Sequence, residues 1–93
     1  MNSPDSPALS SLQGQLVVLD VASPFVVVGT LHGQDDMYLI LTDADVHDLR
    51  DSNTTREAYV HESSVHGVGV NRRRVLVRRS EVVSISALED VVG

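Results

Sequence analysis

The chain of 93 residues contains no cysteine and no lysine, and its only aromatic residues are Phe25, Tyr38 and Tyr59. A domain of this size buries only roughly 60–65% of the surface of its extended chain, so its stability is small. Disulfides, bound metals or association usually supply the remainder. Disulfides are excluded, and no clustered metal-ligand motif stands out. We therefore expect association with other copies of the chain and no cofactor; the missing cysteine also agrees with a reducing cytosol.

Long apolar runs are missing as well, since none approaches the ~20 consecutive apolar residues that cross a bilayer. The first residues, 1–5, have neither the basic region nor the apolar core of a secretory signal. We expect a cytoplasmic protein that does not associate with membranes. The net charge is −6, and the positive charge consists of seven arginines, five of them between Arg72 and Arg79. This acidic balance argues against general phosphate-backbone binding but permits a local arginine-lined site.

The beginning of the chain predicts a short helix. Ser6 can cap it, Pro7 suits the first helical position, and Leu9 and Leu12 fall on one face. Gly14 is expected to end it. Valine-rich segments follow, and β-branched side chains favour strands over helices.

Five strands are predicted after the helix. We expect them at residues 15–20, 25–31, 37–42, 68–78 and 82–86. Gly29 lies within the second strand and predicts a bulge or a sharp bend. The polar stretch 43–64 is expected to be irregular, with Tyr59 and Val60 in a hairpin arm.

Two groups of segments resemble the two sequence motifs of the Sm and Sm-like (LSm) family. The first motif is similar to GQLVVL (14–19), VGTLHG (28–33) and MYLILTDA (37–44), and the second to VLVRRSEVVSI (75–85). The resemblance implies a mostly β fold: a short helix, then a five-stranded, strongly bent antiparallel barrel of the SH3-like kind. We expect one domain, with a flexible terminus at 1–5, an Sm-like domain at 6–88 with a long loop at about 46–67, and a tail at 89–93.

The resemblance also implies a homo-oligomeric ring, in which the fourth strand of one subunit pairs with the fifth strand of its neighbour. The predicted interface consists of Val75, Leu76, Val77, Val82, Val83 and Ile85. Exposed apolar strand edges favour association, and closed pairing leaves no edge free. The alternative is a monomer whose edges are covered by its C-terminal tail.

In this family the RNA pocket combines an aromatic residue or histidine before the methionine, an asparagine after it, and an Arg-Gly pair in the second motif. Here Arg78 matches the arginine, whereas Asp36, Tyr38 and Arg79 replace the stacking residue, the asparagine and the glycine. Loss of the asparagine amide typically costs about 1–3 kcal/mol of base discrimination. Tyr38 can instead stack on a base, and the two arginines can add charge and cation–π contact. These changes predict a weaker single-stranded RNA site that departs from the usual uridine pocket.

Structural explanations compete with RNA binding at these residues. Arg78 can pair with Asp35 or Asp36 to hold two turns together, and Tyr38 can serve packing. The run Arg72–Arg74 is either a phosphate-binding patch or the basic half of intersubunit salt bridges. The acidic half would then come from Asp43, Asp45, Asp48 and Asp51.

Two further kinds of site are not favoured. His61, Glu62 and His66 suggest a metal site, but strand residues five apart fall on opposite faces. No catalytic constellation stands out, and a small barrel has a filled interior, so we do not expect an enzyme.

The sequence leaves three functions open. The first is a ring subunit that binds single-stranded RNA, as an RNA-chaperone-type or ribonucleoprotein component. The second is a structural or adaptor ring for protein–protein assembly without RNA. A peptide-binding SH3-like barrel ranks third, because its groove would need more aromatic residues.

Overall fold

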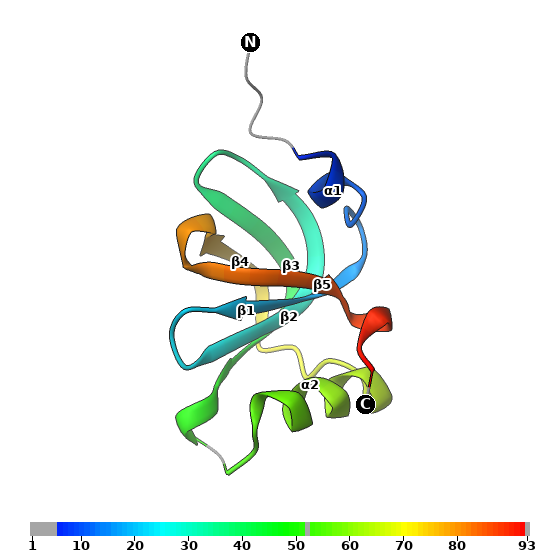
Figure 1. Ribbon diagram of the computed structural model, residues 1–93, viewed down its shortest axis with the longest axis vertical. Helices are drawn as coiled ribbons and strands as arrows, with labels where there is room; N and C mark the ends of the chain where they lie inside the picture. Colours follow the sequence, from blue (N-terminus) through cyan, green and yellow to red (C-terminus); the bar gives the residue numbers. More distant parts are fainter. Residues whose placement is uncertain (1–5, 52, 93) are drawn as a thin grey trace.

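The computed structural model describes residues 6–51 and 53–92. Figure 1 shows a bent sheet with one helix at each end of the molecule. The elements are α1 (Pro7–Ser10), β1 (Leu16–Val21), β2 (Phe25–Gln34), β3 (Tyr38–Asp48), η1 (Leu49–Asp51), α2 (Arg56–His66), β4 (Arg72–Arg78), η2 (Arg79–Glu81), β5 (Val82–Ala87) and η3 (Leu88–Asp90). The predicted mostly β fold with a short N-terminal helix and five antiparallel strands is confirmed.

Helix α1 begins as the sequence predicts. The Ser6 side chain accepts a hydrogen bond from the Leu9 amide (3.3 Å), and Pro7 occupies the first turn. The helix ends at Ser10, four residues before Gly14, and the chain then continues through turns. Leu9 and Leu12 pack against the sheet, as their spacing predicts.

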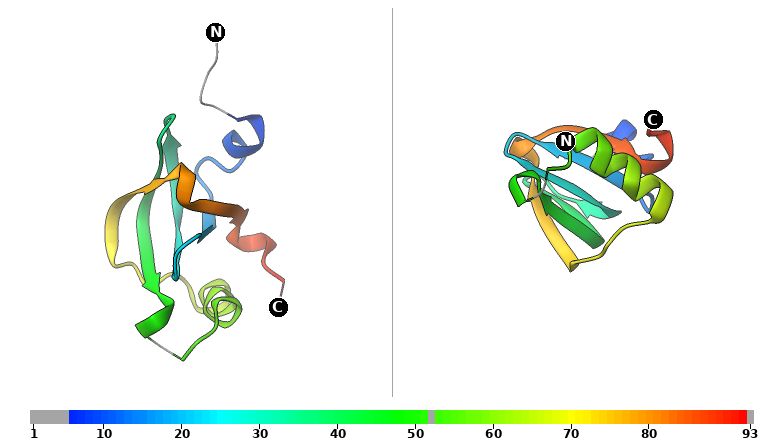
Figure 2. Two further views of the ribbon diagram at one scale, coloured as in Figure 1. Left: turned by 60° about the vertical axis from the view of Figure 1, so that its left-hand side comes forward. Right: turned by 90° about the horizontal axis from the view of Figure 1, so that it is seen from below.

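The five strands form one sheet in the order β4-β3-β2-β1-β5, so β4 and β5 are its two edges. The sheet is open and bends strongly, as the views in Figure 2 show. The bend lies where the register of β2 against β3 shifts, between Val28 and Thr30 and again between Leu31 and Gly33. The predicted irregularity at Gly29 is confirmed.

Gly29 allows this bend because β3 comes too close for a side chain. A Cβ atom at this position would lie 2.7 Å from the Ala44 Cβ and 3.2 Å from the Thr42 carbonyl oxygen. On the β3 side, Asp43 adopts a φ of +49°, which aspartate tolerates better than most residues. The two strands therefore bend at the same place.

Apolar side chains pack on both faces of the sheet. The first core lies on the concave face; its buried members are Val17, Leu19, Val21, Val27, Leu31, Leu39, Leu41 and Ala44. The second core lies on the opposite face beneath α2; its buried members are Val18, Val26, Val28, Val60 and Leu88. Strands β1 and β2 contribute to both cores. Their nearly continuous apolar sequences follow from this double burial, since successive side chains point to opposite faces.

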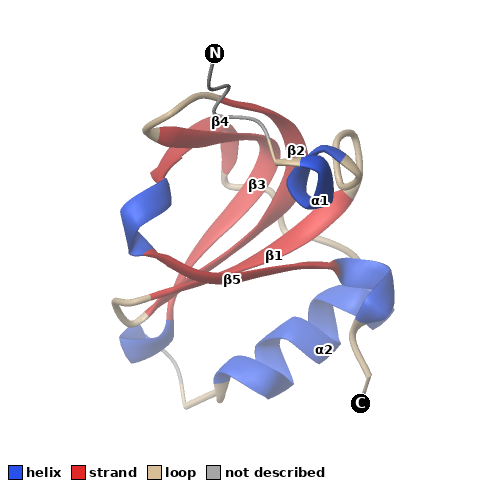
Figure 3. Cartoon of the chain, turned by 45° about the horizontal axis from the view of Figure 1, so that its top comes forward, coloured by secondary structure: helices blue, strands red, loops and turns tan. Residues whose placement is uncertain are grey.

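The prediction that residues 43–64 are irregular is wrong. Strand β3 continues to Asp48, and an 11-residue helix, α2, occupies Arg56–His66. Tyr59 and Val60 therefore belong to a helix and not to a hairpin arm. Figure 3 shows this helix running beneath the sheet, with β5 and β1 drawn directly above it.

Local signals at both ends explain helix α2. Thr55 caps its first turn by accepting a hydrogen bond from the Ala58 amide (3.1 Å). Gly67 ends it with a φ of +90°, a conformation that favours glycine. Between these ends only Val60 and Ser63 are buried, so the helix has almost no apolar periodicity. Its position depends on contacts with the sheet. The fourth strand is also shorter than predicted, because it begins at Arg72 and not at Val68.

Candidate functional site

The turns that follow β2 and β4 meet at one end of the sheet and form a shallow pocket of about 170 Å³. Asp36, Met37, Arg78, Arg79 and Ser80 line it. Three of the four residues predicted to contact RNA are therefore together. The fourth, Tyr38, pairs with Arg78 across strands β3 and β4, and directly paired residues share one face of a sheet.

Arg79 fastens the two turns together. Its Nη1 donates to the Gln34 Oε1 (3.0 Å) and to the Asp35 carbonyl oxygen (2.7 Å). Its backbone amide donates to the Met37 carbonyl oxygen (2.9 Å). The sequence suggested this structural role for Arg78, and the neighbouring arginine performs it instead.

Asp35 fixes the conformation of the turn to which Arg79 donates its hydrogen bonds. One oxygen of its carboxylate accepts hydrogen bonds from the amides of Met37 (2.8 Å) and Tyr38 (2.7 Å). These bonds, first that of Met37, lower the pKa of Asp35 and outweigh its slight desolvation, and the nearby Arg79 charge acts in the same direction. The carboxylate is therefore a fixed part of the turn at neutral pH.

Arg78 is exposed and has no ion pair with another residue in the described ranges. Asp36 is also exposed, whereas Tyr38 is partly buried. The turn pocket thus presents one ordered arginine, one exposed arginine and one exposed carboxylate. This set can attract a phosphate weakly and offers the faces of Arg78 and Tyr38 to a base.

The six residues predicted for the ring interface lie on the two edge strands. Val75, Val77, Val82 and Ile85 turn inward and pack against the first core. The other two point away from it: Leu76 is 51% exposed and Val83 is 73% exposed. Val83 is the extra residue of a bulge, because β5 pairs Ser84 with Asp20 and Val82 with Val21. Each edge therefore presents one large apolar side chain to solvent.

The predicted acidic partners of Arg72–Arg74 are partly engaged within the chain. The Asp45 carboxylate accepts hydrogen bonds from the Tyr59 hydroxyl and from Asn71 Nδ2. The Asp48 carboxylate lies 2.8 Å from the Arg50 guanidinium. Hydrogen bonds from the Arg50 side chain and backbone amide lower the pKa of Asp48 to about 2. Asp43 and Asp51 are exposed, so an intersubunit bridge to them stays a prediction.

His61 and His66 lie on helix α2 and not on a strand. The His66 Nε2 lies 3.6 Å from a Glu62 carboxylate oxygen, one helical turn away, and both side chains are largely exposed. Within residues 6–51 and 53–92, no group of three histidine or acidic side chains is placed to hold a metal ion.

A polar cluster that the sequence analysis did not identify anchors α2 to β3. The Tyr59 ring stacks on the His47 ring with centroids 4.0 Å apart, and its hydroxyl donates to Asp45. Burial, followed by the hydrogen bond to Asp45, raises the pKa of the Tyr59 phenol. Asn71 closes the cluster by exchanging hydrogen bonds with the Val46 backbone (3.0 and 3.1 Å). These residues are far apart in sequence, and no spacing rule links them.

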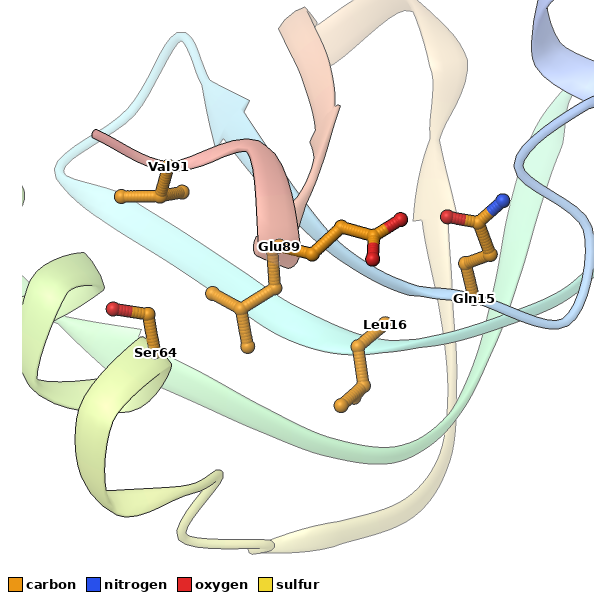
Figure 4. Close-up of a pocket in the computed structure, with 6 residues that line it drawn as sticks. Gln15, Leu16, Ser64, Glu89 and Val91 are labelled. Atoms are coloured by element: carbon orange, nitrogen blue, oxygen red, sulfur yellow. The ribbon is translucent and has the colours of Figure 1, made fainter.

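Two larger pockets lie on the α2 side of the sheet. The tail pocket, of about 570 Å³, lies between α2, η3 and the start of β1. Figure 4 shows its lining: Gln15, Leu16, Ser64, Leu88, Glu89 and Val91. The helix pocket, of about 590 Å³, lies between α2, β1 and β5. It is lined by Val18, Asp20, Val21, Ala22, Arg56, Glu57, Val60, Val83, Ser84, Ser86, Val91 and Val92.

The described helices are all too short or too polar to cross a membrane.

The similarity to known proteins lies in the fold and not in the sequence. Neither the protein-family models nor the curated proteins give a match. Among solved structures, an Sm protein of Pyrococcus abyssi, determined in complex with a uridine heptamer, is similar with a TM-score of 0.60 and 18% identity, over 89% of this chain and 99% of that one. An Sm-like protein of Archaeoglobus fulgidus gives a TM-score of 0.58 and 21% identity, over 89% and 95%. The bent five-stranded sheet with its N-terminal helix is therefore an Sm-like fold.

Proposed function

We propose that this chain is a subunit of a homo-oligomeric Sm-like ring that binds single-stranded RNA at the turn pocket. The observation that carries this proposal is the sheet order, because it leaves β4 and β5 as two free edges of one chain. Similarity in fold to a Pyrococcus Sm protein determined with a uridine heptamer supports the choice of ligand.

The two edges suit each other chemically. The stretch 71–78 contains four arginines and no acidic residue, whereas the stretch 80–92 contains Glu81, Glu89 and Asp90 and no basic residue. Leu76 and Val83 add one exposed apolar side chain to each edge. Pairing of β4 with β5 of a second copy would satisfy both edges, bury these side chains and bring opposite charges together.

The turn pocket suits a single strand better than a duplex. Arg78 and Tyr38 are cross-strand neighbours. A base can therefore stack on either side chain, and the charge of Arg78 can attract a phosphate of the same strand. Asp36 repels phosphate and offers no flat surface, and the asparagine amide that would recognise a uracil edge is absent. Each site is therefore expected to be weak and poorly selective for uridine. Repetition around a ring would compensate through several simultaneous contacts with one strand.

The test combines molecular mass with RNA affinity. Size exclusion with light scattering should give a defined oligomer at micromolar concentration. Fluorescence anisotropy with oligo-U and oligo-A at low salt should detect salt-dependent binding with only a small difference between the two. Arg78→Ala should weaken binding about tenfold, the scale of one lost stacking and charge contact. Arg50→Ala removes the same charge from an exposed residue outside the turn pocket and should have little effect.

Absence of binding to either oligonucleotide at low salt would contradict the RNA part of the proposal. The adaptor ring without RNA would then be favoured. The roles of Arg79 and Asp35 support this second candidate, because both side chains hold the turns together and the chain is acidic overall. A chain that remains monomeric would contradict both candidates.

A further inference from the structure

The helix pocket borders the β5 edge. It is separate from the turn pocket proposed to bind RNA. Six of its twelve lining residues are valines, from β1, α2, β5 and the residues after η3, and its polar lining residues are Asp20, Arg56, Glu57, Ser84 and Ser86. Its volume of about 590 Å³ falls within the range of pockets that hold small ligands or inserted side chains. An occupant that fits these walls combines an apolar side chain with a polar or charged group.

The charges around the helix pocket are unbalanced in one place. Arg56 Nη1 lies 3.3 Å from one oxygen of Asp20, and the Ser84 hydroxyl donates to the other oxygen (2.8 Å). The charges of Asp20 and Arg56 therefore compensate each other. Glu57, in the first turn of α2, is exposed and has no ion pair with any other residue that the structure describes. The pocket thus combines valine side chains with one negative charge that no other described residue pairs.

The face of β4 that points away from the first core, its outer face, carries an apolar side chain and a positive charge that would complement the helix pocket. Leu76 and Arg74 pair across the strands with Ile40 and Thr42, on the face opposite to Val75 and Val77 of the first core. Both side chains are exposed, and Arg74 has no ion pair within the described part of the chain. Two residues along a strand are about 6.6–6.8 Å apart on the same face. This strand therefore presents an apolar side chain beside a cation.

We propose that the helix pocket receives Leu76 and Arg74 of a second copy, with the arginine paired to Glu57; this inference rests on the ring proposed above. When β4 of one subunit pairs with β5 of another, the two sheets join into one. The face of each sheet that carries the first core, its inner face, then continues into the inner face of the other. Val75 and Val77 then follow Val82 and Ile85, and the outer side chains of β4 stand beside those of β5. The outer side chains of β5 include Val83, Ser84 and Ser86, which line the helix pocket. Helix α2 thereby becomes part of the assembly interface.

The charged half of this contact is tested by exchanging the charges of Glu57 and Arg74. Dissociation of the oligomer is followed by light scattering over a dilution series at low salt. Glu57→Arg and Arg74→Glu are each expected to raise the dissociation concentration about three- to tenfold. The double variant should return it toward the wild-type value. Glu62→Arg makes the same change on an exposed part of the same helix and should leave it unchanged.

The apolar half is tested by a second matched pair. Leu76→Ser should weaken the oligomer, whereas Val65→Ser, at a residue of α2 that is 59% exposed and lies outside the pocket, should not. Circular dichroism verifies that each variant is folded. The inference is overturned if both charge reversals dissociate like the wild type, or if the double variant is as weak as the two single changes combined. In those cases a wild-type oligomer still supports the ring. A wild-type chain that is monomeric at every concentration overturns the ring and, with it, this contact.

Discussion

The two cores of this small sheet differ in size and in what they hold together. The first core joins all five strands and helix α1 through eight buried side chains and eight partly buried ones. The second core has five buried side chains, and α2 supplies only Val60 among them. Polar contacts from Tyr59 and Arg56 complete the attachment of this helix. Damage to the first core should therefore affect the whole chain, whereas damage to the second should affect mainly α2.

The largest expected effects come from truncating one side chain in each core and comparing the losses in the free energy of unfolding. Leu41→Ala removes a fully buried side chain from the first core and should lower the free energy of unfolding by about 2–5 kcal/mol. Val60→Ala removes two methyl groups from the second core and should cost roughly 1–2 kcal/mol. Denaturant unfolding measures both free energies at one fixed protein concentration, because the proposed association would add to stability.

Hydrogen exchange then distinguishes local from global effects. The Val60→Ala variant should exchange faster in α2 while the amides of β1 to β3 keep their protection. The Leu41→Ala variant should lose protection throughout. Equal acceleration across the chain in both variants would mean that α2 and the sheet unfold as one unit and would remove the distinction between the cores.

The bend at Gly29 belongs to the first core and should be the next most sensitive position. Gly29→Ala places a Cβ 2.7 Å from the Ala44 Cβ, and crowding of this kind typically costs about 1–3 kcal/mol. Adding Ala44→Gly removes the nearest atom but leaves the Ala44 Cα at 3.0 Å and the Thr42 carbonyl oxygen at 3.2 Å. The double variant should therefore regain part of the lost stability. Thermal unfolding of both variants checks this, and no recovery would mean that the backbone contacts dominate.

Tyr59→Phe should have an effect no larger than that of Val60→Ala, because it removes only the hydrogen bond to Asp45 that helps to attach α2. The expected loss is roughly 1–2 kcal/mol near neutral pH, confined to α2. The folded pKa of Tyr59 is raised above 10.0, so its stabilising contribution is complete below pH 10 and is lost as the pH rises further. The variant should unfold with less dependence on pH above 10. An unchanged alkaline profile would show that Tyr59 does not titrate with unfolding.

The strands that carry both cores could be predicted from the sequence, whereas helix α2, which covers the second core, could not. Valine-rich segments located all five strands, and Gly29 marked the bend, because both signals are local. Asp36, Arg78 and Arg79 of the turn pocket were identified from motif positions. The exchange of roles between the two arginines depends on how two turns meet in space. Neighbouring arginines look alike in a sequence, and only their geometry separates a structural role from an exposed one.

Helix α2 was missed for a different physical reason. Its stability comes from Thr55, Gly67 and contacts with strands far away in sequence, and not from an apolar stripe of its own. The cap at Thr55 and the glycine at Gly67 were the available signals. They are common in loops too, so polar composition outweighed them. The cluster of Asp45, Tyr59 and Asn71 exists only once the helix has folded against β3.

The bulge at Val83 has a consequence for how the chain avoids misassembly. Before it joined the proposed ring, a newly folded chain would display β5 to the solvent, and straight apolar edges can recruit further strands into fibrils. The extra residue breaks the register with β1 between Asp20 and Val21, so the exposed edge cannot form one long flat ladder. The irregularity that would present Val83 to a neighbour in the proposed ring thus also makes β5 a poor template for amyloid growth.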